Sequence, residues 1–336
     1  MNHREKILDI SNLHTGFYIR GGIYYAVKDV SLHVNKKEIV CVVGESGCGK
    51  SVMSLSIMKL LPKHNAKIDK GEIYYNGTNL ISLNEEDMNH LRGNEISMIF
   101  QEPMTALNPV LTIGFQVDEV LVNHARMSKR DIRRKSIDLL KQVGIPRPEQ
   151  IIKEYPHQLS GGMRQRVMIA MAIACQPKLL IADEPTTALD VTVQAQILDL
   201  MKEVQNDVGM AIMLITHDLG VVAEMADRVV VMYAGQVVEE ADVDRLFYTP
   251  MHPYTKALLH AIPRMEKNKE VLNTINGMVP SLVNMPEIGC RFVERCPEVQ
   301  AACHSINPQL GEIAEGHAVR CLLYEASQPE NSAEVG

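Results

Sequence analysis

A glycine-rich string that directly follows a short apolar run limits the fold of this chain. The string, residues 44–51, fits the pattern G-x-x-x-x-G-K-[ST]. The apolar run before it, residues 39–43, predicts a buried strand of a parallel sheet, and a helix should follow the string. In that context the glycines allow a tight turn whose N–H groups, with the helix N-terminus, face phosphates. The alternative is a glycine-rich turn that binds nothing.

The string supplies side chains as well as backbone groups. Lys50 would reach the β- and γ-phosphates of a nucleotide, and Ser51 would offer its hydroxyl to Mg²⁺. We therefore expect a nucleotide site built by one continuous set of residues, namely Gly44, Glu45, Ser46, Gly47, Cys48, Gly49, Lys50, Ser51 and Val52.

Two further apolar runs have the same form as the first. They lie at residues 178–183 and 211–216, separated from it by helix-length intervals. Three such runs predict a doubly wound α/β core. Alternating stretches at 23–34 and 71–76 predict half-exposed antiparallel strands, and a polar, charged stretch from about 86 to 158 predicts an inserted helical lobe.

Composition excludes several classes of protein. The chain has 336 residues, 46% of them hydrophobic, and a formal net charge of −7 with acidic and basic residues mixed. No basic stripe suggests a nucleic-acid partner. No apolar run approaches the roughly 18 to 20 residues of a membrane-spanning helix, and the charged start does not fit a signal peptide. We expect a cytoplasmic location.

The second apolar run ends in two carboxylates. Asp183 would hold the Mg²⁺ shell, and Glu184 would polarise the attacking water as general base. An Asp-Glu pair after a strand is often only a helix cap. Beside a phosphate loop, the catalytic interpretation is favoured.

A third string lies shortly before these carboxylates and makes the pattern specific. It begins Leu159, Ser160, Gly161, Gly162, Met163. A serine and two glycines at a helix start form an anion site from amides and the helix dipole. With this string the sequence resembles the ATP-binding-cassette family over about residues 7–250. Two phosphate-binding surfaces in one chain make sense if two cassettes dock head to tail and each caps the other's ATP.

The resemblance implies roles for further residues. Gln101 matches the glutamine that senses Mg²⁺ and water, and His217 matches the histidine that contacts the γ-phosphate. The loop that crosses the dimer seam corresponds to Ala188, Leu189 and Asp190. An aromatic ring should stack on adenine, and spacing favours Phe17. The neighbouring rings that stay open as alternatives are Tyr18, Tyr24 and Tyr25.

The segment after residue 250 resembles the C-terminal module of dipeptide and oligopeptide importer ATPases, through strings such as 248–255 and 289–297. This resemblance implies a motor at the cytoplasmic face of the membrane that drives peptide uptake. Its partners would be a second cassette subunit in a heterodimer, two transmembrane permeases and, indirectly, an extracytoplasmic peptide-binding protein. Pairing of the chain with itself stays open. So do nickel or glutathione as cargo, an exporter, and a non-transport cassette protein.

Four cysteines of this segment, Cys290, Cys296, Cys303 and Cys321, have the spacing C-x5-C-x6-C-x17-C. Four thiolates can enclose a [4Fe–4S] cluster or a Zn²⁺ ion. Since tight C-x2-C knuckles are missing, the spacing favours the cluster. The resemblance to peptide-importer ATPases also implies a cluster, since members with this quartet are associated with one. Zinc and unligated thiols stay open.

These features divide the chain into three parts. We expect an ATPase domain over residues 1–250 with a helical lobe at about 102–172, a cysteine-containing module over 251–325, and a disordered tail over 326–336.

Overall fold

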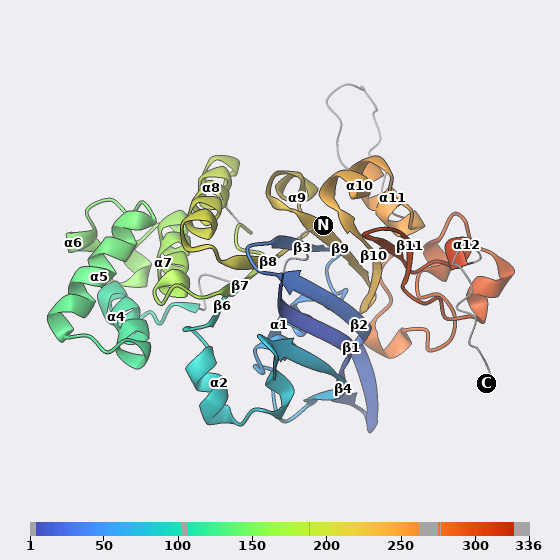
Figure 1. Ribbon diagram of the computed structural model, residues 1–336, viewed down its shortest axis with the longest axis horizontal. Helices are drawn as coiled ribbons and strands as arrows, with labels where there is room; N and C mark the ends of the chain where they lie inside the picture. The colour runs from blue at the N-terminus through green and yellow to red at the C-terminus, as the bar shows by residue number, and fades with distance from the viewer. Residues whose placement is uncertain (1–4, 102–105, 188, 262–274, 276, 326–336) are drawn as a thin grey trace.

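The computed structural model describes residues 5–101, 106–187, 189–261, 275 and 277–325. Its centre is a sheet with the strand order β11-β12-β10-β9-β3-β8-β7-β6 (Figure 1). The neighbours from β9 to β6 are parallel, whereas β10, β12 and β11 are added antiparallel. The strands are β3 (Ile39–Val43), β6 (Ile96–Ile99), β7 (Leu179–Asp183), β8 (Ala211–Thr216), β9 (Arg228–Tyr233), β10 (Gln236–Asp242), β11 (Gly311–Ala314) and β12 (His317–Val319).

The three apolar runs form β3, β7 and β8, which are buried along their whole length. Along β3, Cys41 faces one hydrophobic core, and Val40 and Val42 face another. The first core includes side chains from helices on one face of the sheet, α7 (Gly161–Ile173), α8 (Val191–Val208) and α9 (Leu219–Met225). The second includes α1 (Lys50–Ile57). Coverage on both faces explains the absence of polar alternation in these strands and confirms the α/β core.

A second, antiparallel sheet packs on the side of α1, with the order β2-β1-β4-β5. Its strands are β1 (Lys6–Ile19), β2 (Gly22–Asn35), β4 (Ala66–Tyr75) and β5 (Thr78–Asn79), followed by η1 (Leu80–Ser82) and α2 (Glu85–Leu91). The two alternating stretches predicted as strands lie in β2 and β4. The sequence reading left out the long β1, which joins them as the central partner.

Helices between β6 and β7 form a lobe at one end of the molecule (Figure 1). They are α4 (Ile113–His124), α5 (Lys129–Gln142), α6 (Pro148–Ile151), η2 (Pro156–Gln158) and α7. Side-chain oxygens of Thr112, Ser128 and Ser160 accept from the first-turn N–H groups of α4, α5 and α7. Such caps satisfy donors that a helix start leaves unpaired.

The C-terminal part returns to the main sheet, because β12 pairs with β10. Its other elements are α10 (Val243–Tyr248), α11 (Pro253–His260), η3 (Leu282–Asn284), η4 (Val293–Arg295), η5 (Ala301–His304) and α12 (Leu322–Glu325). Tyr254 and Phe292 are fully buried against Tyr233 of β9, with ring centroids 4.7 to 5.4 Å apart. Packing on the main sheet thus contributes to holding a segment that is poor in apolar residues. The expected tail, 326–336, lies outside the described residues, as do residues 102–105 at the start of the expected lobe.

Candidate functional site: a phosphate loop and the carboxyl ends of four strands

The predicted phosphate loop connects β3 to α1. Gly44 has a φ of 152°, and a Cβ there would lie 2.2 Å from the Met232 carbonyl oxygen of β9. Gly49 is the N-cap of α1 with a φ of 99°. Only glycine fits both positions, which fold the loop back over the strand ends.

Lys50 closes the loop from inside. Its side chain is buried, and its ammonium donates to the carbonyl oxygens of Gly44 at 2.7 Å and Glu45 at 3.0 Å. Cys48 is also buried, and burial raises the pKa of its thiol. Ser51 and Val52 follow in the first turn of α1, where the helix dipole favours an anion.

Polar residues that follow three neighbouring strands meet beside this loop. Gln101 follows β6, Glu184 follows β7 and His217 follows β8. The Glu184 carboxylate accepts from Gln101 Nε2 at 3.1 Å and lies 3.3 Å from His217 Nδ1. Carboxyl ends of parallel strands share one edge of a sheet, where ligands of open α/β folds bind. The structure therefore brings these three predicted residues together.

The surroundings of Glu184 keep its carboxylate ionised. Burial would raise its pKa, but hydrogen bonds from Thr187 and His217 and the charges of His217 and Lys50 outweigh burial, so the pKa is lowered. The Thr187 hydroxyl donates at 3.0 Å. The sequence resemblance places this threonine at the start of the string that matches the dimer-seam loop, but it did not indicate the contact with Glu184, three residues earlier.

Asp183, the last residue of β7, lies deeper than Glu184. It is 3% exposed, and burial raises the pKa of its carboxyl, against hydrogen bonds from Ser51 and Ser54 that lower it. Its Oδ1 is buried without a hydrogen-bond partner among the described residues. A buried carboxylate oxygen without a donor costs free energy unless a cation or donor satisfies it. The position next to Ser51 therefore suits Mg²⁺.

The third string lies apart from the phosphate loop, at the start of α7 in the lobe (Figure 1). Ser160 is exposed and caps the helix by accepting from the Met163 N–H at 3.3 Å. Leu159 before it is buried. A Cβ on Gly161 would have no atom within 4 Å, whereas one on Gly162 would lie 2.9 Å from Val193 of α8. The phosphate loop and the α7 start, both predicted from the sequence to bind phosphate, thus lie at separate places on one chain.

The expected seam loop lies next to that helix pair. Asp190 caps α8 through a hydrogen bond from the Val193 N–H at 2.9 Å, and Leu189 packs against the core. Ala188 lies outside the described residues. Among the candidate adenine-stacking rings, Phe17 is half-buried in β1 opposite Tyr24. The side chain of Tyr25 is engaged in a hydrogen bond, since its hydroxyl donates to Asp69 at 2.8 Å.

The four C-terminal cysteines line one small cavity of about 10 Å³. Gly289 permits this approach, because Cys290 donates its N–H to the Cys303 carbonyl at 2.7 Å and a Cβ on Gly289 would clash there. Burial and then neighbouring cysteines raise the pKa of Cys321 to about 11. Across the part of the chain that the structure describes, however, no group of three His, Cys, Asp or Glu side chains is arranged to hold a metal ion.

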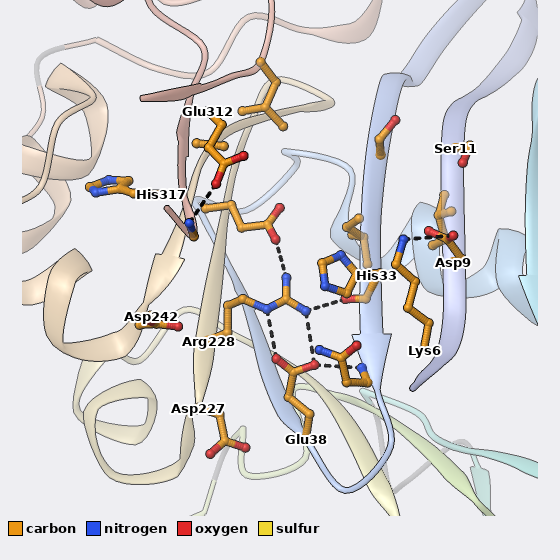
Figure 2. Close-up of a pocket in the computed structure, with 18 residues that line it drawn as sticks. Lys6, Asp9, Ser11, His33, Glu38, Asp227, Arg228, Asp242, Glu312 and His317 are labelled. Carbon is orange, nitrogen blue, oxygen red and sulfur yellow. Dashed lines mark hydrogen bonds and ion pairs between the residues drawn. The ribbon is translucent and has the colours of Figure 1, made fainter. Parts of the chain in front are cut away.

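A separate pocket of about 1010 Å³ lies at the opposite, amino ends of the parallel strands (Figure 2). It is bordered by Glu38, which precedes β3, and by Asp227 and Arg228 at the start of β9. The phosphate loop follows the far end of β3. Acidic groups predominate at its rim. This pocket is distinct from the site that the motifs define.

The fold and the site together define an ATP-binding-cassette ATPase. The chain matches the ABC transporter family over residues 27–187 and the family described as the oligopeptide/dipeptide transporter C-terminal region over residues 238–303. Among solved structures, the dimeric post-hydrolysis state of the ATP-binding cassette MJ0796 bound to ADP and Pi is similar, with a TM-score of 0.64 and 31% identity over 70% of this chain and 98% of that one.

Curated relatives cover nearly the whole chain. The oligopeptide transport ATP-binding protein AppD of Bacillus subtilis is 54% identical, over 97% of this chain and 99% of its own length. The dipeptide transport ATP-binding protein DppD of the same organism is 50% identical, over 96% of each chain. The chain belongs to the ABC transporter family of transport ATPases, in the group that carries the oligopeptide/dipeptide C-terminal region.

None of the helices in the described part of the chain combines the length and hydropathy needed to cross a bilayer.

Proposed function

We propose that this chain hydrolyses ATP to drive import of dipeptides or oligopeptides through a membrane ABC transporter. One observation carries the proposal: Gln101, Glu184 and His217 meet at the strand ends beside the phosphate loop. Relatives named as oligopeptide and dipeptide transport proteins support the cargo. Nickel or glutathione transport and a non-transport role are the alternatives.

ATP would bind with its phosphates on the loop of residues 44–52 and its adenine against Phe17. Lys50 would turn from the loop carbonyls to the β- and γ-phosphates, and Ser51 and Asp183 would hold Mg²⁺ with help from Gln101. Bound Mg²⁺ neutralises charge on the phosphate oxygens. The unpartnered Oδ1 of Asp183 supports this ligand.

Glu184 would act as general base for the attacking water. Its lowered pKa keeps it ionised and able to accept a hydrogen bond from water. Gln101 and His217 donate toward the same carboxylate, so both lie where they can orient water and the γ-phosphate.

The site would be completed by a second cassette. Ser160 and its helix start are exposed and distant from the loop of the same chain, and the similar MJ0796 cassette is described as dimeric. We infer that residues 159–163 cap the partner's ATP, with Leu189 and Asp190, beside Ala188, at the seam. A heterodimer is our proposal, with a homodimer as the alternative.

Membrane attachment would be peripheral, at the cytoplasmic face, through two permease subunits. The helical lobe, about 102–172, would transmit closure of the cassettes to them. We keep the division into an ATPase domain, 1–250, and a C-terminal module, 251–325, as part of the proposal. The continuous sheet through β12 and β10 means that the two parts would move together.

Glu184→Gln tests the catalytic part of this proposal. The amide keeps the shape of the side chain but cannot accept the proton, so phosphate release should fall at least about 100-fold while ATP binding stays near wild type. Both are measured on the full chain, by phosphate release and by titration with ATP. Wild-type turnover in the variant would remove Glu184 from its role.

We also propose that Cys290, Cys296, Cys303 and Cys321 hold a [4Fe–4S] cluster, with Zn²⁺ as the alternative. Support comes from the donor set and its placement: four free cysteines line one cavity, and after burial the neighbouring cysteines contribute to the raised pKa of Cys290 and of Cys321. Metal ligation requires thiolates, so binding would release protons. The ligand side chains would have to turn toward a common centre.

Metal and sulfide analysis of the anaerobically purified full chain tests the cysteine site. A cluster predicts about four irons and four sulfides per chain with visible absorbance, and loss of both in Cys296→Ser. One zinc per chain without sulfide would show that the cysteines hold Zn²⁺ instead of the cluster. A metal-free wild type would overturn both.

A further inference from the structure

Two side chains of the C-terminal segment hold Glu45, the residue after the glycine that opens the phosphate loop. The Glu45 backbone N–H donates to the Tyr254 hydroxyl at 2.9 Å. The Glu45 carboxylate accepts from the two terminal nitrogens of Arg295 at 2.7 and 3.0 Å. Arg295 lies 250 residues further along the chain. The contact therefore joins the nucleotide site to a part of the chain outside the cassette motifs.

Arg295 is itself fixed in place. Its side chain is 5% exposed, and its guanidinium lies over the Tyr233 ring, 5.6 Å from the centroid, and 6.0 Å from that of Phe292. A guanidinium that binds a carboxylate with both nitrogens gives direction as well as charge. Glu45 is thus held by a rigid partner.

The same residue connects directly to the lysine of the loop, because the Glu45 carbonyl accepts from Lys50 at 3.0 Å. Movement of Glu45 would therefore move the backbone that positions Lys50. Its carboxylate also places a negative charge within the loop that receives a triphosphate. Without Arg295 that charge would repel the phosphates, since it would lie unpaired in a partly buried site.

A second arginine of the segment supports the other half of the loop. Arg291, also buried, donates to the Ala234 carbonyl. The next residue, Gly235, donates its N–H to the Cys48 carbonyl at 2.9 Å. Both halves of the loop are thus supported from residues 291–295.

We propose that Arg295 is a positioning residue for the nucleoside triphosphate: it holds and neutralises Glu45 and so sets the affinity of the phosphate loop for ATP. The inference rests on the proposed function, because it presumes that ATP binds at this loop. The new element is a residue of the C-terminal segment that affects ATP binding but not the hydrolysis step.

The test compares ATP affinity and turnover in full-length variants. Arg295→Gln should raise the Kd for ATP about tenfold, with kcat at saturating ATP changed by less than about twofold. Adding Glu45→Gln to that variant removes the unpaired charge and should recover most of the affinity. Arg295→Lys keeps the charge but loses the paired geometry, so its Kd for ATP should lie between those of the wild type and Arg295→Gln. Added salt should reduce the difference in Kd between the wild type and Arg295→Gln.

Arg228 provides a matched control at the other end of the sheet. Its side chain is 10% exposed and binds the Glu38 carboxylate at 2.9 and 3.2 Å (Figure 2). Arg228→Gln should lower the melting temperature and leave the Kd for ATP unchanged. If Arg295→Gln behaves like this control, the arginine is only structural and the inference is wrong.

Lys50→Ala separates this inference from the proposed function. Suppose that the wild type binds ATP and that this binding depends on Lys50. If Arg295→Gln then loses no affinity for ATP, or if adding Glu45→Gln recovers none, the inference about Arg295 is wrong and the proposed function stands. If the wild type does not bind ATP, or binds it equally in Lys50→Ala, the proposed function itself fails.

Discussion

Glu184 has a left-handed backbone conformation, with a φ of 48°. This conformation costs a residue with a Cβ on the order of 1 kcal/mol or more and persists only where its surroundings fix it. Here its N–H donates to the Ile215 carbonyl of β8 at 2.9 Å, and Gln101 and Thr187 hold the carboxylate. The strained backbone turns the carboxylate back over the strand ends, where the proposed function needs a water-activating group.

Two loop glycines should differ sharply in their tolerance of alanine. A Cβ on Gly44 would lie 2.2 Å from a strand carbonyl, whereas one on Gly47, at a φ of 80°, has no atom within 4 Å. Gly44→Ala should therefore lower the free energy of unfolding by about 3 kcal/mol. Gly47→Ala should lower it by only about 1 kcal/mol, the cost of the backbone conformation. Urea unfolding of both variants measures the difference, and equal losses would contradict it.

At the scale of elements, Arg228 joins strands of both sheets. From β9 it binds Glu38, which precedes β3, Glu240 of β10 and the His33 carbonyl of β2 (Figure 2). Burying a charge is costly unless partners satisfy it, and removing one partner leaves the others uncompensated. This network fixes the antiparallel sheet to the amino ends of the parallel strands, while the phosphate loop lies at their carboxyl ends.

The His33 ring beside this network should make the fold sensitive to acid. Burial, and then the charge of Arg228, lowers the pKa of His33 from 6.5 to about 4. Between those values the unfolded chain binds a proton that the folded ring does not, so stability is full above pH 6.5 and falls as the pH drops toward 4.

His33→Gln removes this titration. Between pH 7 and pH 4 the variant should lose about 1 kcal/mol less unfolding free energy than the wild type, since the ring is partly exposed and solvent screens its charge. Urea unfolding at several pH values checks this, with His304→Gln at an exposed position as the control. Identical pH profiles for wild type and His33→Gln would exclude the ring as the cause.

The sequence predicts the central strands and the site residues for one reason. Strands β3, β7 and β8 are buried on both faces and so appear as uninterrupted apolar runs, and Gly44, Glu184 and His217 each come directly after one. Residues at strand ends are brought together by the topology of a parallel sheet, whatever their separation in sequence. The local sequence pattern is therefore sufficient to predict these strands and the residues at their ends.

Contacts between distant segments leave no such local signal. The pairing of β12 with β10 and the bond from Arg295 to Glu45 depend on where the chain returns after α11. Nothing in the neighbouring residues of Arg295 specifies a partner 250 positions away. The long β1 was missed for a related reason, because register shifts interrupt its alternation of buried and exposed residues.

At the scale of the whole molecule, the cassette is an incomplete enzyme in the proposed function. The phosphate loop lies at the centre, while the α7 start lies on the lobe, so one chain cannot bring both to one triphosphate (Figure 1). A partner that presents Ser160 across the seam would complete the site.

Ser160→Asp should prevent this pairing without harming the single chain. Aspartate is as good an N-cap as serine, so the α7 cap on the Met163 N–H persists and the melting temperature should change little. Its charge, however, would face the partner's γ-phosphate. Ser160→Asn, which also caps but is neutral, is the matched control.

The measurement is the mass of the chain in solution with ATP and Mg²⁺, in the Glu184→Gln background that traps the bound nucleotide. With this chain alone, or mixed with a second cassette subunit if the pair is heteromeric, the Asn variant should form the dimer. The Asp variant should need at least about tenfold more protein, because like charges across an interface cost several kcal/mol. Equal dimerisation of the two variants would mean that the α7 start does not face the partner's triphosphate.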